Sequence, residues 1–198
     1  MKKFLPWIIV AIIAVGLYSW GKTFNNTAVD LKETATKSWG DVESSYQRRN
    51  DLIGNLVKTV QGAADFEKST LEAVIKARSE ATKTTIDPSN ITPEQLAQFN
   101  QAQSGLSSAL SRLLVTVERY PDIKANQNFL ELQSQLEGTE NRINVARDRF
   151  NEDVEPYNKH VKRFPNMILA GLFNFDEMNY YKAEAGSENA PDVDFDFN

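Results

Sequence analysis

Charged side chains interrupt the apolar repeats of this chain at two places, and chemistry could occur there. Arg49 stands where the repeat calls for an apolar residue, with Arg48 and Asp51 beside it. A second stretch is crowded by Glu140, Asn141, Arg142, Arg147 and Asp148. Brought together, these side chains could form a buried acid–base site or a carboxylate-lined metal site. The alternative, which we favour, is that Arg49 pairs with a carboxylate of another helix, Glu140 being the expected partner, and fixes helix register.

Other catalytic chemistry finds little support in the residue types. The chain has no cysteine, which excludes disulfides, thiolate metal sites and cysteine nucleophiles. Any Ser-His-Asp triad would have to use the single histidine, His160. A di-iron bundle needs a Glu-x-x-His motif from each of two helices, which one histidine cannot supply. We expect His160 to lie exposed or at the rim of the fold. The sequence therefore predicts no catalytic, cofactor-binding or metal-binding residues.

The net charge of −5 is carried by the C-terminal end of the chain. Residues 183–198 contain five carboxylates and no basic residue, so the rest of the chain is neutral. A neutral body lacks the basic excess that nucleic-acid binding requires, and no nucleic-acid partner is expected. Small, acidic and proline residues predict that this tail is disordered in the isolated protein. The alternating acids and hydrophobes of residues 192–197 could alternatively dock on a partner.

The N-terminal region has the composition of a membrane anchor. Residues 4–20 carry no charge and would extend about 25 Å as a helix, near the lower limit for crossing a bilayer. Trp7 at one end, with Tyr18 and Trp20 at the other, suits the interfacial aromatic belts. A cleaved signal peptide is the alternative. Signal peptidase sites have small residues after the apolar run, but large residues stand at the end of this run. We expect a retained anchor over residues 1–22, contacting membrane lipid through residues 4–20.

These charged residues would be positioned by long helices, because apolar residues beyond the anchor recur at spacings of three and four. The first helix is expected from about residue 28 to about 83, with a stutter near Glu67. Thr92, Pro93 and Gln95 predict the capped start of a second helix, ended by Pro121. Asn128 and Glu131 suggest the cap of a third, which Pro156 should kink and Pro165 should end.

The repeat of the third helix and the segment after it complete the predicted fold. Large side chains fall every seven residues, namely Phe129, Leu136, Ile143, Phe150, Tyr157 and Phe164. A shorter apolar piece, residues 167–175, could lie across the bundle. The predicted fold class is all-α, with an N-terminal transmembrane helix followed by an elongated antiparallel bundle of three long helices plus a short C-terminal helix. The bundle would occupy residues 23–182 and the acidic tail residues 183–198.

Two long segments resemble a known family. YQRRNDLIGNLVKTVQGAADFEKSTLEAVIKAR at residues 46–78 is similar to the LemA family of bacterial membrane proteins. The likeness continues in YPDIKANQNFLELQSQLEGTENRINVARDRFNEDVEPYNKHVKRFP at residues 120–165. The resemblance implies an N-terminal membrane anchor, an elongated helical bundle and no established biochemical activity. One departure is Gly54, which stands where the family usually has proline.

Two classes of function remain open from the sequence. The first is a noncatalytic membrane-anchored module for interaction or scaffolding at the cell envelope, with an unknown protein partner and a possible homo-oligomer. The second is an enzyme of unrecognised type that uses the Arg/Glu/Asn cluster. A fully packed interface between the helices would favour the first class. A concave pocket lined by titratable groups with shifted pKa values would favour the second class. We expect a single-pass protein of the bacterial inner (cytoplasmic) membrane, with the bundle on the exported side.

Overall fold

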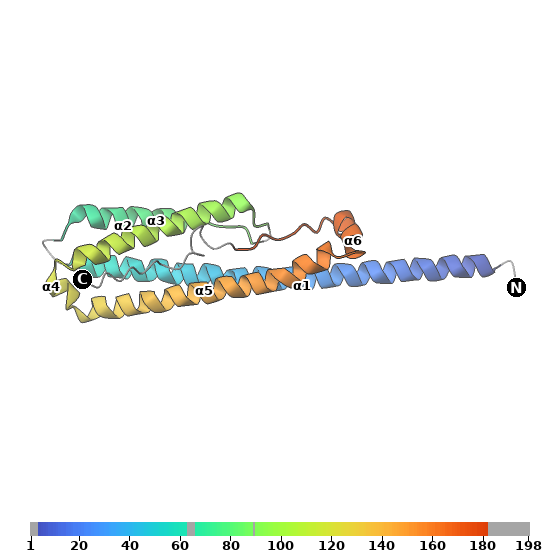
Figure 1. Cartoon of the computed structure of the whole chain (residues 1–198), viewed down its shortest axis with the longest axis horizontal. Helices are drawn as coiled ribbons and strands as arrows, with labels where there is room; N and C mark the ends of the chain where they lie inside the picture. Colours follow the sequence, from blue (N-terminus) through green and yellow to red (C-terminus); the bar gives the residue numbers. More distant parts are fainter. Residues whose placement is uncertain (1–3, 63–65, 89, 182–198) are drawn as a thin grey trace, which may run out of the picture.

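The chain folds into an elongated set of helices (Figure 1). The computed structural model describes residues 4–62, 66–88 and 90–181. These residues contain no strand, and the helices are α1 (Leu5–Gln61), α2 (Lys68–Lys83), α3 (Pro93–Val117), α4 (Pro121–Lys124), α5 (Gln127–Lys162) and α6 (Asn166–Phe173). The all-α class, the long N-terminal apolar helix and the bundle are thereby confirmed. The predicted tail, residues 183–198, lies outside the described residues.

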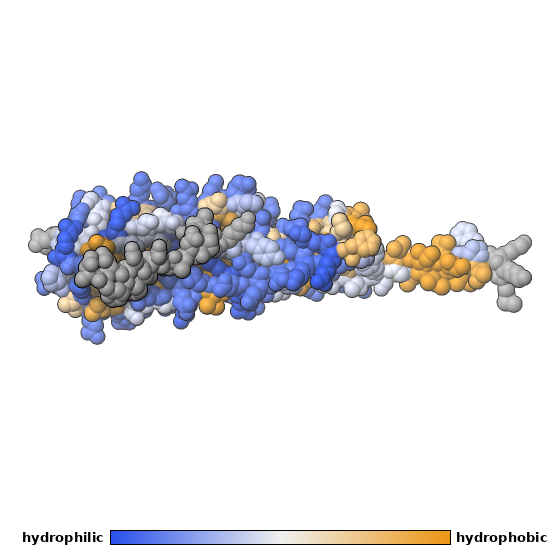
Figure 2. Space-filling model, viewed as in Figure 1, coloured by the Kyte–Doolittle hydropathy of each residue, from blue (hydrophilic) through white to orange (hydrophobic). Residues whose placement is uncertain are grey.

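Helix α1 joins the apolar N-terminal segment to the bundle without interruption. It runs for 57 residues, about 85 Å at the standard rise, and passes straight through the expected boundary between residues 22 and 23. Residues 4–18 are exposed, whereas burial begins near Trp20 and is complete at Phe24. Figure 2 shows the resulting apolar rod projecting from a largely hydrophilic body. Among the described residues, α1 alone is long and apolar enough to cross a membrane.

The predicted single helix from residue 28 to 83 is wrong at its centre. Helix α1 ends at Gln61, and the chain reverses before α2 begins at Lys68. Glycine at position 62 weakens the helix there, because its backbone is costly to hold helical. Buried seam residues continue on both sides of the break, as Val60 and Val74 show. The apolar spacing was therefore real, but it belongs to two helices that each bury one face.

Helices α1 and α5 form a long antiparallel pair, and the α2–α3 hairpin covers only the end of that pair distant from the N-terminus (Figure 1). The predicted cap of α3 is confirmed: Gln95 N–H donates to Thr92 Oγ1 at 3.2 Å, and Thr92 N–H donates to Gln95 Oε1 at 3.0 Å. The predicted cap of α5 is wrong by two residues, since Asn126 Oδ1 accepts the backbone N–H groups of Asn128 and Phe129.

The C-terminal end of α5 also departs from the predicted repeat. The helix continues through Pro156 and ends at Lys162. Phe164, expected in the seam, is 79% exposed because the chain has left the helix before reaching it. Helix α6 follows and runs across the long axis of the molecule in Figure 1, as the sequence suggested for residues 167–175. Residues 174–181 then return along α5 without regular structure; we call them the strap.

Buried side chains form two cores that meet near the middle of the bundle. The proximal core, nearer the N-terminal segment, is rich in aromatic rings: Phe24, Trp39, Tyr46, Phe99, Phe150, Tyr157 and Tyr181. The distal core is mostly aliphatic and includes Leu52, Ile53, Leu56, Val60, Val74, Leu106, Leu113 and Leu136. Between them, Arg49, Asn50 and Gln103 are each only 3% exposed. We call these three residues the polar layer.

Candidate functional site

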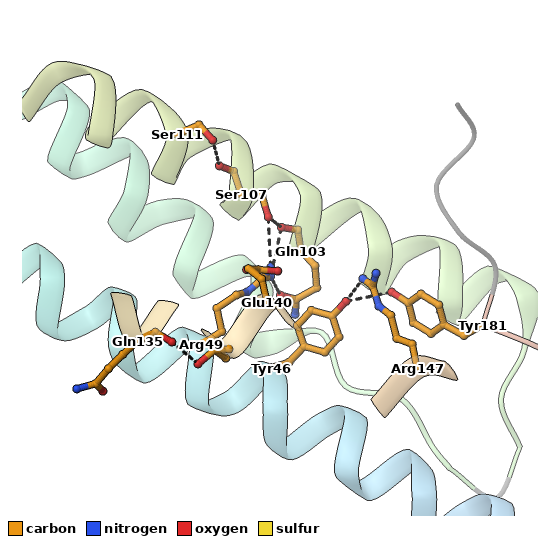
Figure 3. A network of polar contacts seen from close by, with 10 residues as sticks. Tyr46, Arg49, Gln103, Ser107, Ser111, Gln135, Glu140, Arg147 and Tyr181 are labelled. Carbon is orange, nitrogen blue, oxygen red and sulfur yellow. Dashed lines mark hydrogen bonds and ion pairs between the residues drawn. The ribbon is translucent and has the colours of Figure 1, made fainter. Parts of the chain in front are cut away.

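Arg49 is buried at the level where four helices meet. Its Nη1 donates to Glu140 Oε1 of α5 at 3.1 Å and to Ser107 Oγ of α3 at 3.3 Å (Figure 3). Its side chain is 4% exposed, whereas that of Glu140 is 49% exposed. The predicted pair is therefore confirmed, and water still reaches its carboxylate. An ion pair of this kind fixes which residues face each other along the two helices.

Gln103 extends the contact of Arg49 to the remaining helix. Its carbonyl and its side-chain Oε1 both accept from Arg49 Nη2, and its Nε2 donates to the Ala81 carbonyl of α2 at 3.5 Å. The guanidinium also lies 4.9 Å from the centre of the Tyr46 ring, a cation–π distance. The sequence alone predicts no role for Gln103. In the structure it shares the buried charge of Arg49 among α1, α2 and α3.

A second network lies one turn closer to the N-terminal segment, in the proximal core. Arg147 Nη2 donates to the Tyr46 hydroxyl, which lies 3.1 Å from the Tyr181 hydroxyl (Figure 3). Tyr181 O–H donates to Asn100 Oδ1. Because each hydroxyl has one proton, Tyr46 must be the donor to Tyr181. The bonds therefore run in one direction, from Arg147 through both tyrosines to Asn100.

Two asparagines of α5 hold the strap against the bundle. Asn158 accepts from the Met178 N–H at 2.9 Å and donates to the Met178 carbonyl at 2.8 Å. Asn151 does the same at Tyr181, with distances of 2.7 and 2.9 Å. Each amide thus satisfies both backbone groups of one residue, as a neighbouring strand would. Their spacing of seven residues puts both on the same face of α5.

Burial raises the pKa of two tyrosine hydroxyls in this region, those of Tyr157 and Tyr181. Burial, followed by the nearby Asp176 carboxylate, raises the pKa of Tyr157 to about 12. Burial also raises the pKa of Tyr181, with the Tyr46 hydroxyl adding to the effect. For Arg147 burial acts to lower the pKa, but Tyr46 and Tyr181 outweigh it and the pKa is raised. At neutral pH Tyr157 and Tyr181 are therefore neutral hydrogen-bonding groups and Arg147 is charged.

Several residues of the predicted cluster lie apart from these networks. Arg48, Asn141, Arg142 and Asp148 are exposed on the surface. Asp51 is exposed too and lies 3.7 Å from Arg78 of α2. The guanidinium of Arg78 lies directly over Gly54 and donates to the Asn50 carbonyl at 2.7 Å. Any side chain at position 54 would press on that guanidinium, so glycine permits this close approach.

His160 lies at the end of the proximal core, away from both networks. Its ring stacks on Phe24 at 4.9 Å, and its Nε2 is 3.1 Å from the Phe24 carbonyl oxygen. The Asn166 side chain contacts its Nδ1. The position is partly buried, in line with the expected rim location. Among the described residues, its ring nitrogens contact no serine or carboxylate that could build a triad.

Two hollows of the surface lie near these networks. One hollow of about 220 Å³ is lined by Pro93, Leu96, Ala97, Asn100, Asn179 and Tyr180. Small-molecule sites typically enclose about 300–1,000 Å³. A wider hollow of about 550 Å³ lies over exposed polar residues such as Gln47, Arg48 and Asn55. Within the described ranges, no group of three or more His, Cys, Asp and Glu residues could hold a metal ion. Neither hollow is lined by Arg49 or Arg147, whereas Asn100, the last acceptor of the second network, lines the first.

Comparison with known proteins agrees with this architecture. The sequence model of the LemA family matches residues 38–195, most of the chain and nearly all of the bundle. The chain belongs to the LemA family. One relative is Protein LemA of Metamycoplasma hominis, 22% identical over 142 residues, which cover 72% of this chain and 61% of the relative.

Two further relatives carry the name of an organelle. Magnetosome protein MamQ 2 of Paramagnetospirillum magneticum is 26% identical over 197 residues, covering 91% of this LemA-family chain and 71% of the relative. Magnetosome protein MamQ of Magnetospirillum gryphiswaldense is 27% identical over 173 residues, covering 79% and 64%. None of these three names is that of an enzyme. Family membership and the apolar N-terminal helix together indicate a membrane-associated protein.

Proposed function

We propose that this chain is a noncatalytic, membrane-anchored helical-bundle protein that acts as an interaction or scaffold module at the bacterial cell envelope. The observation that carries the proposal is the continuity of α1. One helix supplies both an exposed apolar segment, residues 5–18, and the buried residues from Phe24 to Val60. The bundle would therefore stand on the membrane as a rigid extension of its anchor, on the exported side of the inner membrane.

The noncatalytic part of the proposal is supported by what the buried charges do. Arg49 donates to Glu140 and Arg147 donates to Tyr46, each on a neighbouring helix. A catalytic residue must reach a bound substrate, and the hollows described above lie beside these networks without exposing their guanidinium groups to an enclosed space. The long polar exterior remains as the surface available to a protein partner or to a second copy of the chain.

Membrane anchoring is tested by alkaline carbonate extraction of bacterial membranes. The full chain should stay in the membrane pellet, whereas a variant with Ile9→Lys and Ile13→Lys should become extractable, because charges at the bilayer centre are costly. Val145→Lys, at an exposed position of α5, is the matched control and should stay in the pellet. Recovery of the intact wild-type chain in the soluble fraction would refute the anchor.

The side of the membrane is tested by cysteine labelling, since the chain has no cysteine of its own. Ser111→Cys places a single thiol on an exposed position of α3. A membrane-impermeant maleimide should label it in intact spheroplasts as fully as in lysed cells. Labelling only after lysis would place the bundle in the cytoplasm.

The interaction role is tested with photo-crosslinking residues at exposed positions Val115, Leu130 and Val145. Discrete crosslinked species that depend on position and vanish in the Ile9→Lys, Ile13→Lys variant would support a membrane-assembled module. The competing enzyme hypothesis predicts something different for Glu140→Gln. A cellular phenotype from that variant, with stability and crosslinks unchanged, would favour catalysis by the Arg49 cluster.

A further inference from the structure

Helix α6 is apolar on the side that faces away from the bundle as well as on the side packed against it. Leu169 and Ala170 are buried against the proximal core. Met167, Ile168 and Leu172 point outward, and Leu172 is 71% exposed. Phe164, just before the helix, is exposed as well. No charged residue occurs between Arg163 and Asp176, so the outward surface of α6 carries no charge that would oppose its entry into lipid.

The position of α6 along the molecule is fixed by Phe24. Its ring lies 6.2 Å from the Phe173 ring, at the end of α6, and 5.8 Å from the Phe175 ring. On α1, Phe24 follows Trp20, the last residue of the apolar run, by about one turn, or roughly 6 Å. Helix α6 therefore sits beside the point where α1 leaves the bundle.

The start of α6 lies closer still to the apolar run. His160 of α5 contacts the Phe24 carbonyl, and α5 runs antiparallel to α1. Phe164, four residues beyond His160 in the chain, is therefore displaced toward Trp20 and the exposed part of α1. Figure 2 shows the apolar surface of α6 next to the apolar rod, separated from it by only a short stretch. Because α6 runs across the long axis, it would lie in the plane of a membrane that α1 crosses.

We propose that α6, with Phe164, is a second membrane contact that lies in the interfacial layer of the bilayer spanned by α1. This inference rests on the proposed membrane anchor. A single span leaves a protein free to rotate about the span and to lean in any direction. An apolar helix lying in the interface at one side of the span would bury its outward face in the acyl boundary and set one side of the bundle toward the membrane. The contact is apolar, so neutral lipid should suffice.

Spin labels placed at single cysteines of the full chain, reconstituted in phosphatidylcholine vesicles, test this contact. The three positions are Leu172→Cys in α6, Ile12→Cys in the apolar run and Val145→Cys in the exposed face of α5. The readout is a ratio. It divides the accessibility of the label to oxygen, which concentrates in lipid, by its accessibility to a water-soluble nickel complex. The ratio at Leu172 should exceed that at Val145 several-fold and stay below the ratio at Ile12, which reports the bilayer interior. Adding Ile168→Lys should shift the Leu172 ratio toward the aqueous value.

The other outcomes separate the two proposals. An aqueous ratio at Ile12 would overturn the anchor and the α6 contact together. A lipid ratio at Ile12 with an aqueous ratio at Leu172 would overturn the α6 contact alone. Shielding of Leu172 from both reagents would mean that protein covers the helix, and would also overturn it. Dilution with unlabelled chain, or deletion of residues 184–198, would then identify the cover as a second copy or the acidic tail.

Discussion

The proximal and distal halves of the bundle bury side chains of different kinds and are built from different elements. In the distal half, α2 packs on α1, and side chains from the α2–α3 hairpin, α1 and α5 form one mostly aliphatic cluster. In the proximal half only the first turns of α3 reach the core, through Leu96 and Phe99, and the strap lies beside α1 and α5. Rings such as Trp39 and Phe150 fill the space that helices fill elsewhere, packing edge-to-face at 5.2 Å.

The comparison shows two ways of closing a bundle. Helices satisfy their own backbone groups, so the distal half needs only apolar side chains between them. The strap has no ladder of its own, and its backbone must be satisfied by side chains from α5. Asn151 and Asn158 provide those bonds, and the aromatic rings supply the buried area. The polar layer lies between the aliphatic distal core and the aromatic proximal core.

The largest expected effect comes from removing a ring of the proximal core. Trp39→Ala should destabilise the chain by about 3–5 kcal/mol, because Trp39 is buried and contacts Phe99, Phe150 and Tyr181. Hydrogen exchange in detergent should accelerate mainly in the proximal half. Leu113→Ala, in the distal core, is the counterpart and should accelerate exchange mainly in the distal half. Equal acceleration of both halves by either variant would show that the polar layer is no boundary.

Arg49→Met should cost about 2–3 kcal/mol in chemical unfolding. The substitution leaves Gln103 Oε1 buried without its charged donor, while the half-exposed Glu140 can recover hydration. Arg149→Met is the matched control: its guanidinium lies 3.8 Å from Asp41 on the surface, and exposed pairs contribute little. If Arg49→Met melts within about a degree of the wild type, the polar layer does not hold the two halves together.

Asn158→Ala should cost about 1–2 kcal/mol, because it leaves both backbone groups of Met178 without their partners. Protection from hydrogen exchange should fall within the strap and stay unchanged in the distal half. Asn144→Ala makes the same substitution on α5, two repeats away and exposed, and should have no measurable effect. Equal effects of the two variants would mean that the strap does not depend on the asparagine bonds.

The smallest effect is a pH dependence confined to the proximal half. The pKa of Tyr157 is raised from its usual 10 to about 12 in the folded chain, so its neutral form stabilises the fold fully below pH 10. That stability is lost as the pH rises from 10 to 12, by about 1 kcal/mol at pH 11. Unfolding at pH 9 and 11 measures the loss, and Tyr157→Phe should reduce it. An unchanged loss in Tyr157→Phe would assign it to other groups, such as Tyr181.

Local signals allowed part of this architecture to be predicted from the sequence. A charged residue in an apolar repeat has few ways to be accommodated, and the contact of Arg49 with Glu140 followed from that restriction. The cap at Thr92 was equally predictable, because a capping box uses residues three apart and needs no tertiary information.

The errors arose where tertiary packing selects between local options. Spacings of three and four persist from Val60 to Val74, and they cannot show that the chain reverses between them. Asn126 and Asn128 are both good caps, and only the start of α5 distinguishes them. The strap left no periodic signal at all. Asparagines recur at positions 144, 151 and 158, but which of them bind backbone depends on where the strap lies.

Because α1 is unbroken, a tilt of the proposed membrane span would be transmitted along the whole bundle. From residue 21 to Gln61 the helix extends about 60 Å beyond the proposed span. Transmembrane helices tilt by about 20° on average, and such a tilt would carry the far end of the bundle sideways by about 20 Å. A change in bilayer thickness that alters the tilt by a few degrees would thus be read out as a displacement of several ångströms at the distal tip, where α4 connects the hairpin to α5.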